Sequence, residues 1–154
     1  MKLVLLSGAA LLAAATTAMA CPDYSQTGAS YDVNGEQLYA GFDLSVVAGG
    51  ENNIANCSLP GVSGAGYFIT APDFSFFLTG MAGYDLEVSV QGDCDTALLV
   101  NTPSASWFFD DDSAGELQPY MLLSGVGDGR LDAWVGTYNG EYCNATLHLE
   151  TWLP

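Results

Sequence analysis

The sequence predicts an all-β protein, a disulfide-stapled two-sheet β-sandwich with jelly-roll or Greek-key-like connections. Three observations support this fold class. Several short segments alternate apolar and polar residues. The 154 residues include 18 glycines and 6 prolines, many of them in turn-forming pairs between those segments. No long stretch has the spacing of an amphipathic helix. Short strands separated by frequent turns are typical of β-sandwiches.

The clearest strand pattern occurs in residues 86–90, 131–135 and 145–149, where every second residue is apolar. Such a strand buries one face and exposes the other. Pairs such as Asn34-Gly35 and Asn139-Gly140 predict turns. Further strands are expected at residues 38–46, 66–70, 74–79, 97–101, 107–110 and 119–123.

The N-terminus has the features of a signal peptide. Lys2 is followed by an apolar run over residues 3–15, and Ala18-Met19-Ala20 fits a cleavage site. The apolar run is too short to span a bilayer. We therefore expect residues 1–20 to direct export to the periplasm or the extracellular space. We expect residues 21–64 to form an N-terminal extension packed on a sandwich of residues 65–154.

The charge balance excludes several classes of partner. After cleavage at residue 20, Arg130 is the single Lys or Arg against 18 acidic residues, which gives a net charge of −17. Nucleic-acid binding and docking on an anionic membrane surface both need basic residues, so both are excluded. This charge favours bound cations. We expect Arg130 itself to form a surface ion pair with Asp128 or Asp132.

Four cysteines in an exported chain indicate two disulfides. Of three possible pairings we favour Cys21–Cys57 and Cys94–Cys143, because each bond then ties the ends of one half of the chain. The alternative is that Cys21, directly after the cleavage site, carries a lipid. Ala18 stands where a bacterial lipobox has leucine, and lipidation would leave one cysteine unpaired, so we favour the disulfide.

Two acidic clusters form a candidate calcium site. Asp93 and Asp95 would point to the same side of an extended segment, and Asp110, Asp111 and Asp112 lie at the end of a predicted strand. If the clusters lie close together, their oxygens suit a hard cation such as calcium. The spacing does not fit an EF-hand loop. The alternative is that these carboxylates accept backbone N–H bonds within turns.

No catalytic set is recognisable. The sequence has no G-x-S-x-G motif and no flanking glycines for an oxyanion hole. His148, the only histidine, is expected on the outward face of the last strand as a solvated or cross-strand side chain. Trp134 and Tyr138 are weak candidates for ligand binding, because alternation places Trp134 on the wetter face. The alternative for both is packing in the core or at a sheet edge.

Several short motifs follow one another between residues 73 and 150. They are Leu-Glu-Val-Ser-Val at 86–90, Gly-Asp-Cys-Asp-Thr-Ala-Leu-Leu-Val at 92–100, Asp-Asp-Asp-Ser at 110–113, the glycine-rich 125–129, Trp-Val-Gly-Thr-Tyr at 134–138 and Ala-Thr-Leu at 145–147. In this order they resemble the bacterial pre-peptidase C-terminal (PPC) domain, and the match spans about half of the chain.

The resemblance implies a non-catalytic jelly-roll-like sandwich of the kind that usually follows a secreted peptidase. Relatives of that family include collagen-binding modules that take calcium. The acids most like the family's are Asp95, Asp111 and Asp112. The pair Cys94 and Cys143 departs from the general family pattern. The chain therefore also resembles small stand-alone exported proteins of Gram-negative bacteria.

The sequence thus favours a non-catalytic exported binding or accessory module, with calcium as a candidate stabilising ion and an unidentified protein or polysaccharide as ligand. One alternative is a structural envelope protein that self-associates through sheet edges. The other is a secreted hydrolase, for which a peptidase label would follow from family association alone. The missing catalytic residues count against this last alternative.

Overall fold

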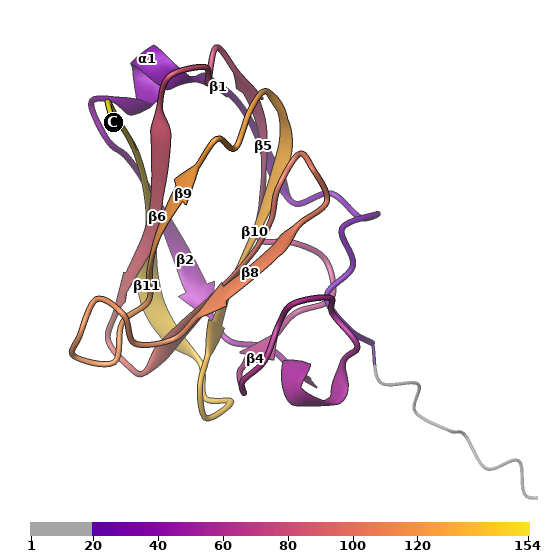
Figure 1. Ribbon diagram of the computed structural model, residues 1–154. Helices are drawn as coiled ribbons and strands as arrows, with labels where there is room; N and C mark the ends of the chain where they lie inside the picture. Colours follow the sequence, from indigo (N-terminus) through magenta and orange to yellow (C-terminus); the bar gives the residue numbers. More distant parts are fainter. Residues whose placement is uncertain (1–19) are drawn as a thin grey trace, which may run out of the picture.

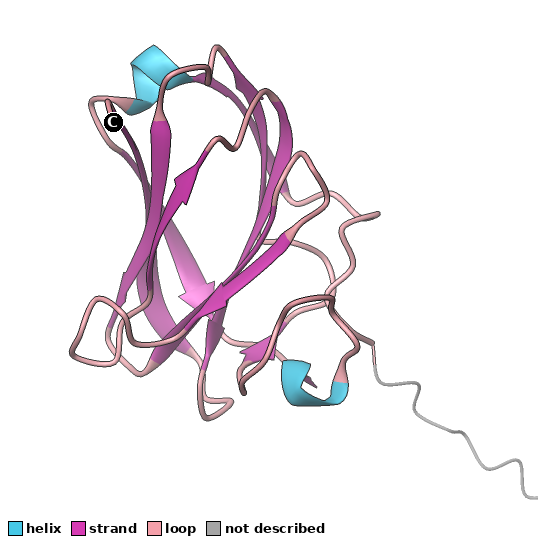
Figure 2. Cartoon of the chain, viewed as in Figure 1, coloured by secondary structure: helices cyan, strands magenta, loops and turns pink. Residues whose placement is uncertain are grey.

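The computed structural model describes residues 20–154, and the expected signal peptide lies outside them except for its last residue. Two β-sheets pack face to face, which confirms the predicted disulfide-stapled sandwich (Figures 1 and 2). The described residues contain little helix, limited to α1 (Gly35–Leu38) and the short 3-10 helix η1 (Ile54–Asn56). Within residues 20–154, no helix has the length and apolar character needed to cross a membrane.

The first sheet is built around β10 (Gly129–Thr137), which pairs on one side with β5 and β4 and on the other with β7. Its other strands are β1 (Ala29–Asn34), β3 (Asn52–Asn53), β4 (Tyr67–Phe68), β5 (Phe74–Thr79), β7 (Thr96–Asn101) and β8 (Trp107–Asp110). Strand β1 runs parallel to β5, whereas the other pairs are antiparallel.

The second sheet has the order β2 (Phe42–Ala48), β11 (Cys143–Trp152), β6 (Asp85–Gly92) and β9 (Tyr120–Ser124), all antiparallel. Its strands show the predicted alternation. In β6, Leu86, Val88 and Val90 are buried, and Leu147 and Leu149 of β11 lie beside them in the same core. The opposite face of this sheet is partly open to solvent.

A second apolar cluster lies on the outer side of the first sheet. Trp134 is fully buried there with Ile54, Phe68 and Leu99. The segment that carries η1 and β4 covers this side (Figure 1). The expectation that Trp134 lies on a wetter face is therefore wrong. The alternation of side chains along the strand correctly assigns Trp134 to the outer face of the first sheet. The segment that carries η1 and β4 covers this face and shields it from water.

The expected division of the chain at residue 64 does not describe the fold. Strand β2 pairs along β11 from Phe42 opposite Leu149 to Ala48 opposite Cys143, and β1 pairs with β5 along its whole length. Residues 21–64 therefore supply strands to both sheets and are not an extension packed on a separate sandwich.

The predicted turn at Asn34-Gly35 is instead the start of α1. The side chain of Asn34 accepts from the backbone N–H of Gln37 (2.9 Å), and the Gln37 side chain accepts from the backbone N–H of Asn34 (3.1 Å). This reciprocal pair is a capping box. Because α1 extends to Leu38, the next strand, β2, begins at Phe42 and not at residue 38 as predicted.

Both predicted disulfides are present. Cys21–Cys57 fastens the N-terminal segment to the residues that follow η1. Cys94–Cys143 joins the β6–β7 turn to the first residue of β11. No free cysteine occurs among residues 20–154, which agrees with a disulfide at Cys21 and not with a lipid.

Candidate functional site: an acidic rim

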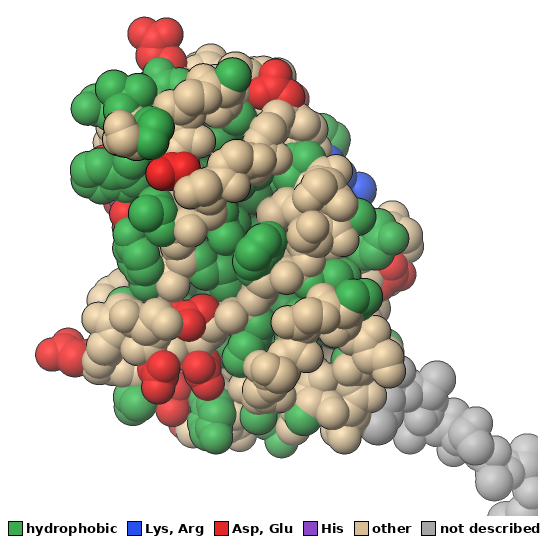
Figure 3. Space-filling view, viewed as in Figure 1, with side chains coloured by type: hydrophobic (Ala, Val, Ile, Leu, Met, Phe, Trp, Pro, Cys, Tyr) green, Lys and Arg blue, Asp and Glu red, His purple; other side chains and the backbone are tan. Residues whose placement is uncertain are grey.

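Three connections meet at one end of the sandwich, and we call the hollow between them the acidic rim. It is lined by Asp95, Asp111, Asp112, Leu117 and Tyr138 and has a volume of about 180 Å³. These residues come from the β6–β7, β8–β9 and β10–β11 connections. Figure 3 shows acidic side chains gathered at the lower end of the view, where the same connections lie in Figure 1.

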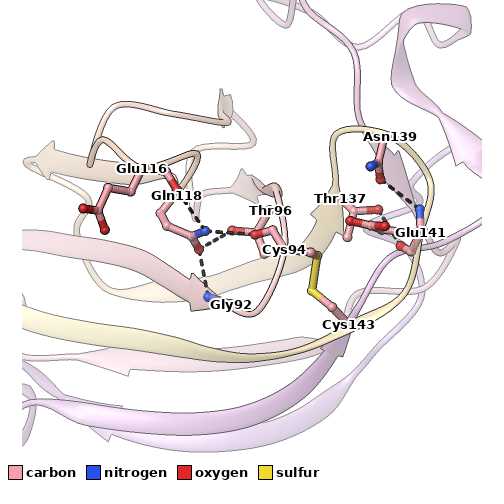
Figure 4. Close-up of a disulfide and its surroundings, with 9 residues drawn as sticks. All are labelled: Gly92, Cys94, Thr96, Glu116, Gln118, Thr137, Asn139, Glu141 and Cys143. Carbon is pink, nitrogen blue, oxygen red and sulfur yellow. Dashed lines mark hydrogen bonds between the residues drawn. A yellow bond between two sulfur atoms is a disulfide. The ribbon is translucent and has the colours of Figure 1, made fainter.

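One buried amide, that of Gln118, fixes the base of the rim (Figure 4). Its Oε1 accepts from the backbone N–H of Gly92 (2.8 Å) and from the hydroxyl of Thr96 (2.9 Å). Its Nε2 donates to the carbonyl of Cys94 (2.9 Å). The Cys94–Cys143 disulfide lies beside this network. Hydrogen bonds therefore hold the β6–β7 connection to the β8–β9 connection, and the disulfide ties the β6–β7 connection to the start of β11.

The β10–β11 connection is fixed in the same region. The hydroxyl of Thr137 donates to the carbonyl of Glu141 (2.7 Å), and the N–H of Glu141 donates to Asn139 Oδ1 (3.1 Å). The N–H of Tyr138 donates to the carbonyl of Asp95 (3.0 Å). All three connections are thus linked before any ligand arrives.

The β8–β9 connection contains a strained turn. Gly115, Glu116 and Leu117 are all left-handed, with φ of 80°, 52° and 63°. This conformation is unfavourable for residues with a Cβ, and such strain persists only where the surroundings enforce it. Here the N–H of Thr96 donates to the carbonyl of Leu117 (3.2 Å). The turn leaves the Leu117 side chain 55% exposed.

The carboxylates of the rim repel one another. Partial desolvation, followed by the charges of Asp112 and Glu141, raises the pKa of Asp95. Partial desolvation also raises the pKa of Asp111, with further contributions from Asp112, Asp110 and Asp95. A nearby like charge disfavours ionisation. The rim therefore presents negative charge that the surrounding side chains do not balance.

The sole Lys or Arg among residues 20–154 lies elsewhere. Arg130 Nη2 forms an ion pair with Asp132 Oδ1 (2.9 Å). Asp132 is one of the two predicted partners, but it is buried, so the pair is not the surface ion pair that was expected. It lies at the opposite end of the first sheet's β7–β10 pair from the rim, because Asp132 is opposite Asn101 and Thr137 is opposite Thr96. No basic side chain of the described chain therefore neutralises the rim.

The five predicted calcium ligands do not share one site. Asp110 holds its own loop, because its carboxylate accepts from the N–H and hydroxyl of Ser113 (3.1 and 2.5 Å) and from the N–H of Tyr120 (2.9 Å). Asp93 lines a separate hollow beside β2 and β11. The β6–β7 connection is a turn and not an extended segment, so Asp93 and Asp95 do not share a face.

Asp95, Asp111 and Asp112 do line one hollow. Across residues 20–154, however, no three His, Cys, Asp or Glu side chains are grouped closely enough to hold a metal ion. Calcium binding stays a prediction, and of its five candidate ligands only these three line the same hollow.

The two aromatic candidates have different outcomes. Tyr138 lines the rim and is 47% exposed, so it is available to a ligand. Trp134 is not available, because it is buried and its Nε1 donates to the carbonyl of Thr70 (3.2 Å). Sequence reasoning missed Leu117, since no local pattern distinguishes an exposed leucine at the tip of a loop from a core leucine.

His148 lies on the open face of the second sheet, as predicted. Its Nδ1 is 2.6 Å from Asp43 Oδ1 across the strand pair, and its Nε2 is 3.3 Å from Glu150 Oε2. Partial burial alone would lower the pKa of His148, but hydrogen bonds with the two carboxylates outweigh this and raise it. A nucleophile–base pair requires a hydrogen bond from a serine or cysteine to the imidazole, whereas the two ring nitrogens of His148 are paired with Asp43 and Glu150.

Comparison with known proteins gives a structural likeness but no match to a family model or a curated protein. The resemblance to the PPC domain therefore stays a prediction. Among solved structures, the chain is similar to PliG of Aeromonas hydrophila, a periplasmic lysozyme inhibitor of g-type lysozyme. The two chains are 14% identical, the match covers 82% of this chain and 99% of that one, and the TM-score is 0.47.

Proposed function

We propose that the protein is an exported, non-catalytic binding module that captures a partner protein through a lysine or arginine side chain inserted into the acidic rim. One observation carries the proposal. Asp95, Asp111 and Asp112 line one hollow, and no basic side chain of the described chain neutralises them. A cation supplied by a partner would relieve their repulsion and form charge-assisted hydrogen bonds.

The surroundings of the rim favour a protein as the source of that cation. Leu117 and Tyr138 are exposed beside the carboxylates, and interfaces combine apolar or aromatic anchors with charged groups. The hydrogen bonds of Gln118 order the site in advance, which lowers the entropic cost of binding. The strong net negative charge would also speed the encounter with a basic partner.

Export and the absence of catalysis belong to the same proposal. The signal-like N-terminus and two disulfides support an oxidising compartment outside the cytoplasm. Both nitrogens of His148 face carboxylates, and all four cysteines are oxidised. PPC-like membership is part of the proposal too, supported by the order of the motifs along β6, β7 and β8.

The test uses short peptides that combine lysine or arginine with leucine, titrated calorimetrically at low and high salt. The rim variant carries Asp95→Asn, Asp111→Asn and Asp112→Asn. A matched control carries Asp32→Asn, Glu36→Gln and Asp85→Asn, which remove the same charge around α1 and the adjoining strand ends. We expect the rim variant to lose about tenfold or more in affinity and the control to lose much less.

Equal losses in the two variants would show that only net charge attracts the peptides, and the proposed site would be wrong. A further variant, Tyr138→Ser, tests the apolar part of the site. If it binds a leucine-containing peptide as tightly as the unaltered protein does, the rim attracts basic peptides without recognising a protein surface.

A further inference from the structure

A second pocket lies at the other end of β7 from the rim, and we call it the Arg130 pocket. It has a volume of about 310 Å³ and opens between the N-terminal segment and the β7–β8 loop. Asn101 and Asp132 contribute from β7 and β10, Arg130 lies beside them, and Tyr24 of the N-terminal segment and Pro103 of the β7–β8 loop complete the lining. None of these residues contributes to the acidic rim.

Asn101 and Asp132 are direct cross-strand partners, and both are buried, with 3% and 2% exposure. The Asp132 Oδ1 atom accepts from the hydroxyl of Ser75 (2.5 Å) and from Arg130 Nε (2.9 Å). The other carboxylate oxygen, Oδ2, accepts none of the hydrogen bonds formed by residues 20–154.

Asn101 is the unusual member of this set. Its Nδ2 is buried and donates to no acceptor within the described part of the chain. Leaving a buried donor unpaired costs stability, and native proteins rarely tolerate it. An apolar side chain in this position would carry no unpaired donor and would avoid that cost. The amide is therefore best explained by a ligand that supplies the acceptor.

The charges of the pocket favour a neutral ligand. Arg130 and Asp132 neutralise each other, and the net charge of −17 after cleavage repels anions. The Asn101 amide needs an acceptor, and Asp132 Oδ2 can take a donor. A ligand with two neighbouring hydroxyl groups satisfies both, because a hydroxyl donates one hydrogen bond and also accepts at its oxygen.

The walls favour a ligand with an apolar face. The Tyr24 ring is half-exposed and is held by an edge-on contact with Trp107 (ring centroids 5.8 Å apart, 76° between planes). A sugar ring has polar hydroxyls on its rim and C–H groups on its faces, so it can pack against an aromatic ring while its hydroxyls reach polar groups. We infer that the Arg130 pocket binds a neutral sugar unit of a polysaccharide.

Both walls are ordered without a ligand. In the β7–β8 loop, the N–H of Thr102 donates to the carbonyl of Ser106 (2.9 Å), and the N–H of Ala105 donates back to the carbonyl of Thr102 (2.8 Å). On the other side, Arg130 Nη2 donates to the carbonyl of Gln26. Preformed walls are a common property of small-ligand sites, and this volume is at the lower end of their size range.

The test follows the side-chain N–H signals of Asn101 and Arg130 by NMR during titration with maltotriose, cellotriose, chitotriose and trigalacturonate. We expect at least one neutral trisaccharide to shift both signals at millimolar concentration, and trigalacturonate to shift neither. The Asn101→Leu variant, followed through the Arg130 signal, should lose about tenfold or more in affinity. Its melting temperature should stay the same or rise, because the unpaired donor is gone.

Tyr24→Ala should weaken sugar binding and Tyr24→Phe should retain it, while Tyr142→Ala on the distant β10–β11 connection serves as the control. The inference is wrong if no trisaccharide shifts these signals, if Asn101→Leu binds sugar as tightly as the unaltered protein, or if an uncharged tripeptide binds more tightly than every sugar. The triple rim variant should bind sugar normally, so this inference and the proposed function fail independently.

Discussion

Gln118 shows how a single polar side chain can hold two loops together. Its amide is 6% exposed and bonds to Gly92, Cys94, Thr96 and Glu116. No sequence motif predicts this role, because the partners come from two separate connections. What the sequence does show at this scale is the acidic character of the rim, through Asp95, Asp111 and Asp112.

Replacing Gln118 with alanine should destabilise the protein by about 2–4 kcal/mol, because it leaves the hydrogen-bonding groups of Gly92, Cys94 and Thr96 without a partner. Urea unfolding measures this, with Gln91→Ala on the exposed face of β6 as the control. Backbone amides of residues 93–95 and 114–117 should exchange hydrogen faster in the variant. If stability and exchange are unchanged, the network does not hold the rim.

Asp73 gives a pH-dependent prediction. Burial raises the pKa of its carboxyl group to about 6, although the N–H of Val135 donates to Oδ2 (2.7 Å). Between pH 3.8 and about 6 the folded state holds this proton more tightly than the unfolded state. The contribution of Asp73 to the free energy of unfolding therefore falls as pH rises through this window.

Asp73→Asn keeps an acceptor for Val135 but carries no charge. We expect the variant to be more stable than the unaltered protein above pH 6 by about 1–3 kcal/mol, and nearly equal to it at pH 3.8. Urea unfolding across this range measures the difference. A constant difference at every pH would show that Asp73 does not titrate as described.

At the scale of elements, strands with strong local patterns were predictable. The expected strands at 74–79 and 107–110 coincide with β5 and β8, and those at 86–90, 131–135 and 145–149 lie inside β6, β10 and β11. Strand β1 was missed, because the residues of Ala29–Asn34 are only partly buried or exposed and give no strong apolar alternation. Its pairing with β5 is a long-range contact that local sequence does not specify.

The covering layer on the first sheet explains the error over Trp134 and leads to a prediction. The Cys21–Cys57 bond fastens part of that layer. Replacing both cysteines with serine should cost about 4 kcal/mol in the chain-entropy model. It should also loosen the layer and shift tryptophan fluorescence to the red as Trp134 meets water. The Cys94→Ser/Cys143→Ser variant is the comparison, because its loop length is similar but it leaves Trp134 covered.

At the scale of the whole molecule, composition was the strongest guide. The excess of acidic residues argues against nucleic acid and anionic membranes as partners, and that expectation stays a prediction. Composition did not reveal where the one cation would lie. The placement of Arg130 beside Asn101 and Asp132 depends on the registers of β7 and β10, which only the assembled sheet defines.

The expected effect of calcium is also a whole-molecule prediction. Millimolar calcium should raise the melting temperature more than sodium chloride of equal ionic strength. A site present only in the folded state adds about 2.7 kcal/mol at a hundredfold excess over Kd. The increment should disappear in the triple rim variant. Equal effects of the two salts would mean that only charge screening operates, and calcium should then be discarded as a ligand.

The last two strands of the chain, β10 and β11, occupy the middle of the two sheets. Strand β2 has no partner in its sheet until β11 arrives, and β5 and β7 are joined only through β10. During synthesis, therefore, neither sheet can be completed until residues 129–152, which form β10 and β11, have left the ribosome. The chain is therefore expected to remain unfolded while it is synthesised. An unfolded chain is what passage through a narrow translocation channel requires, so this order of strands suits the proposed export.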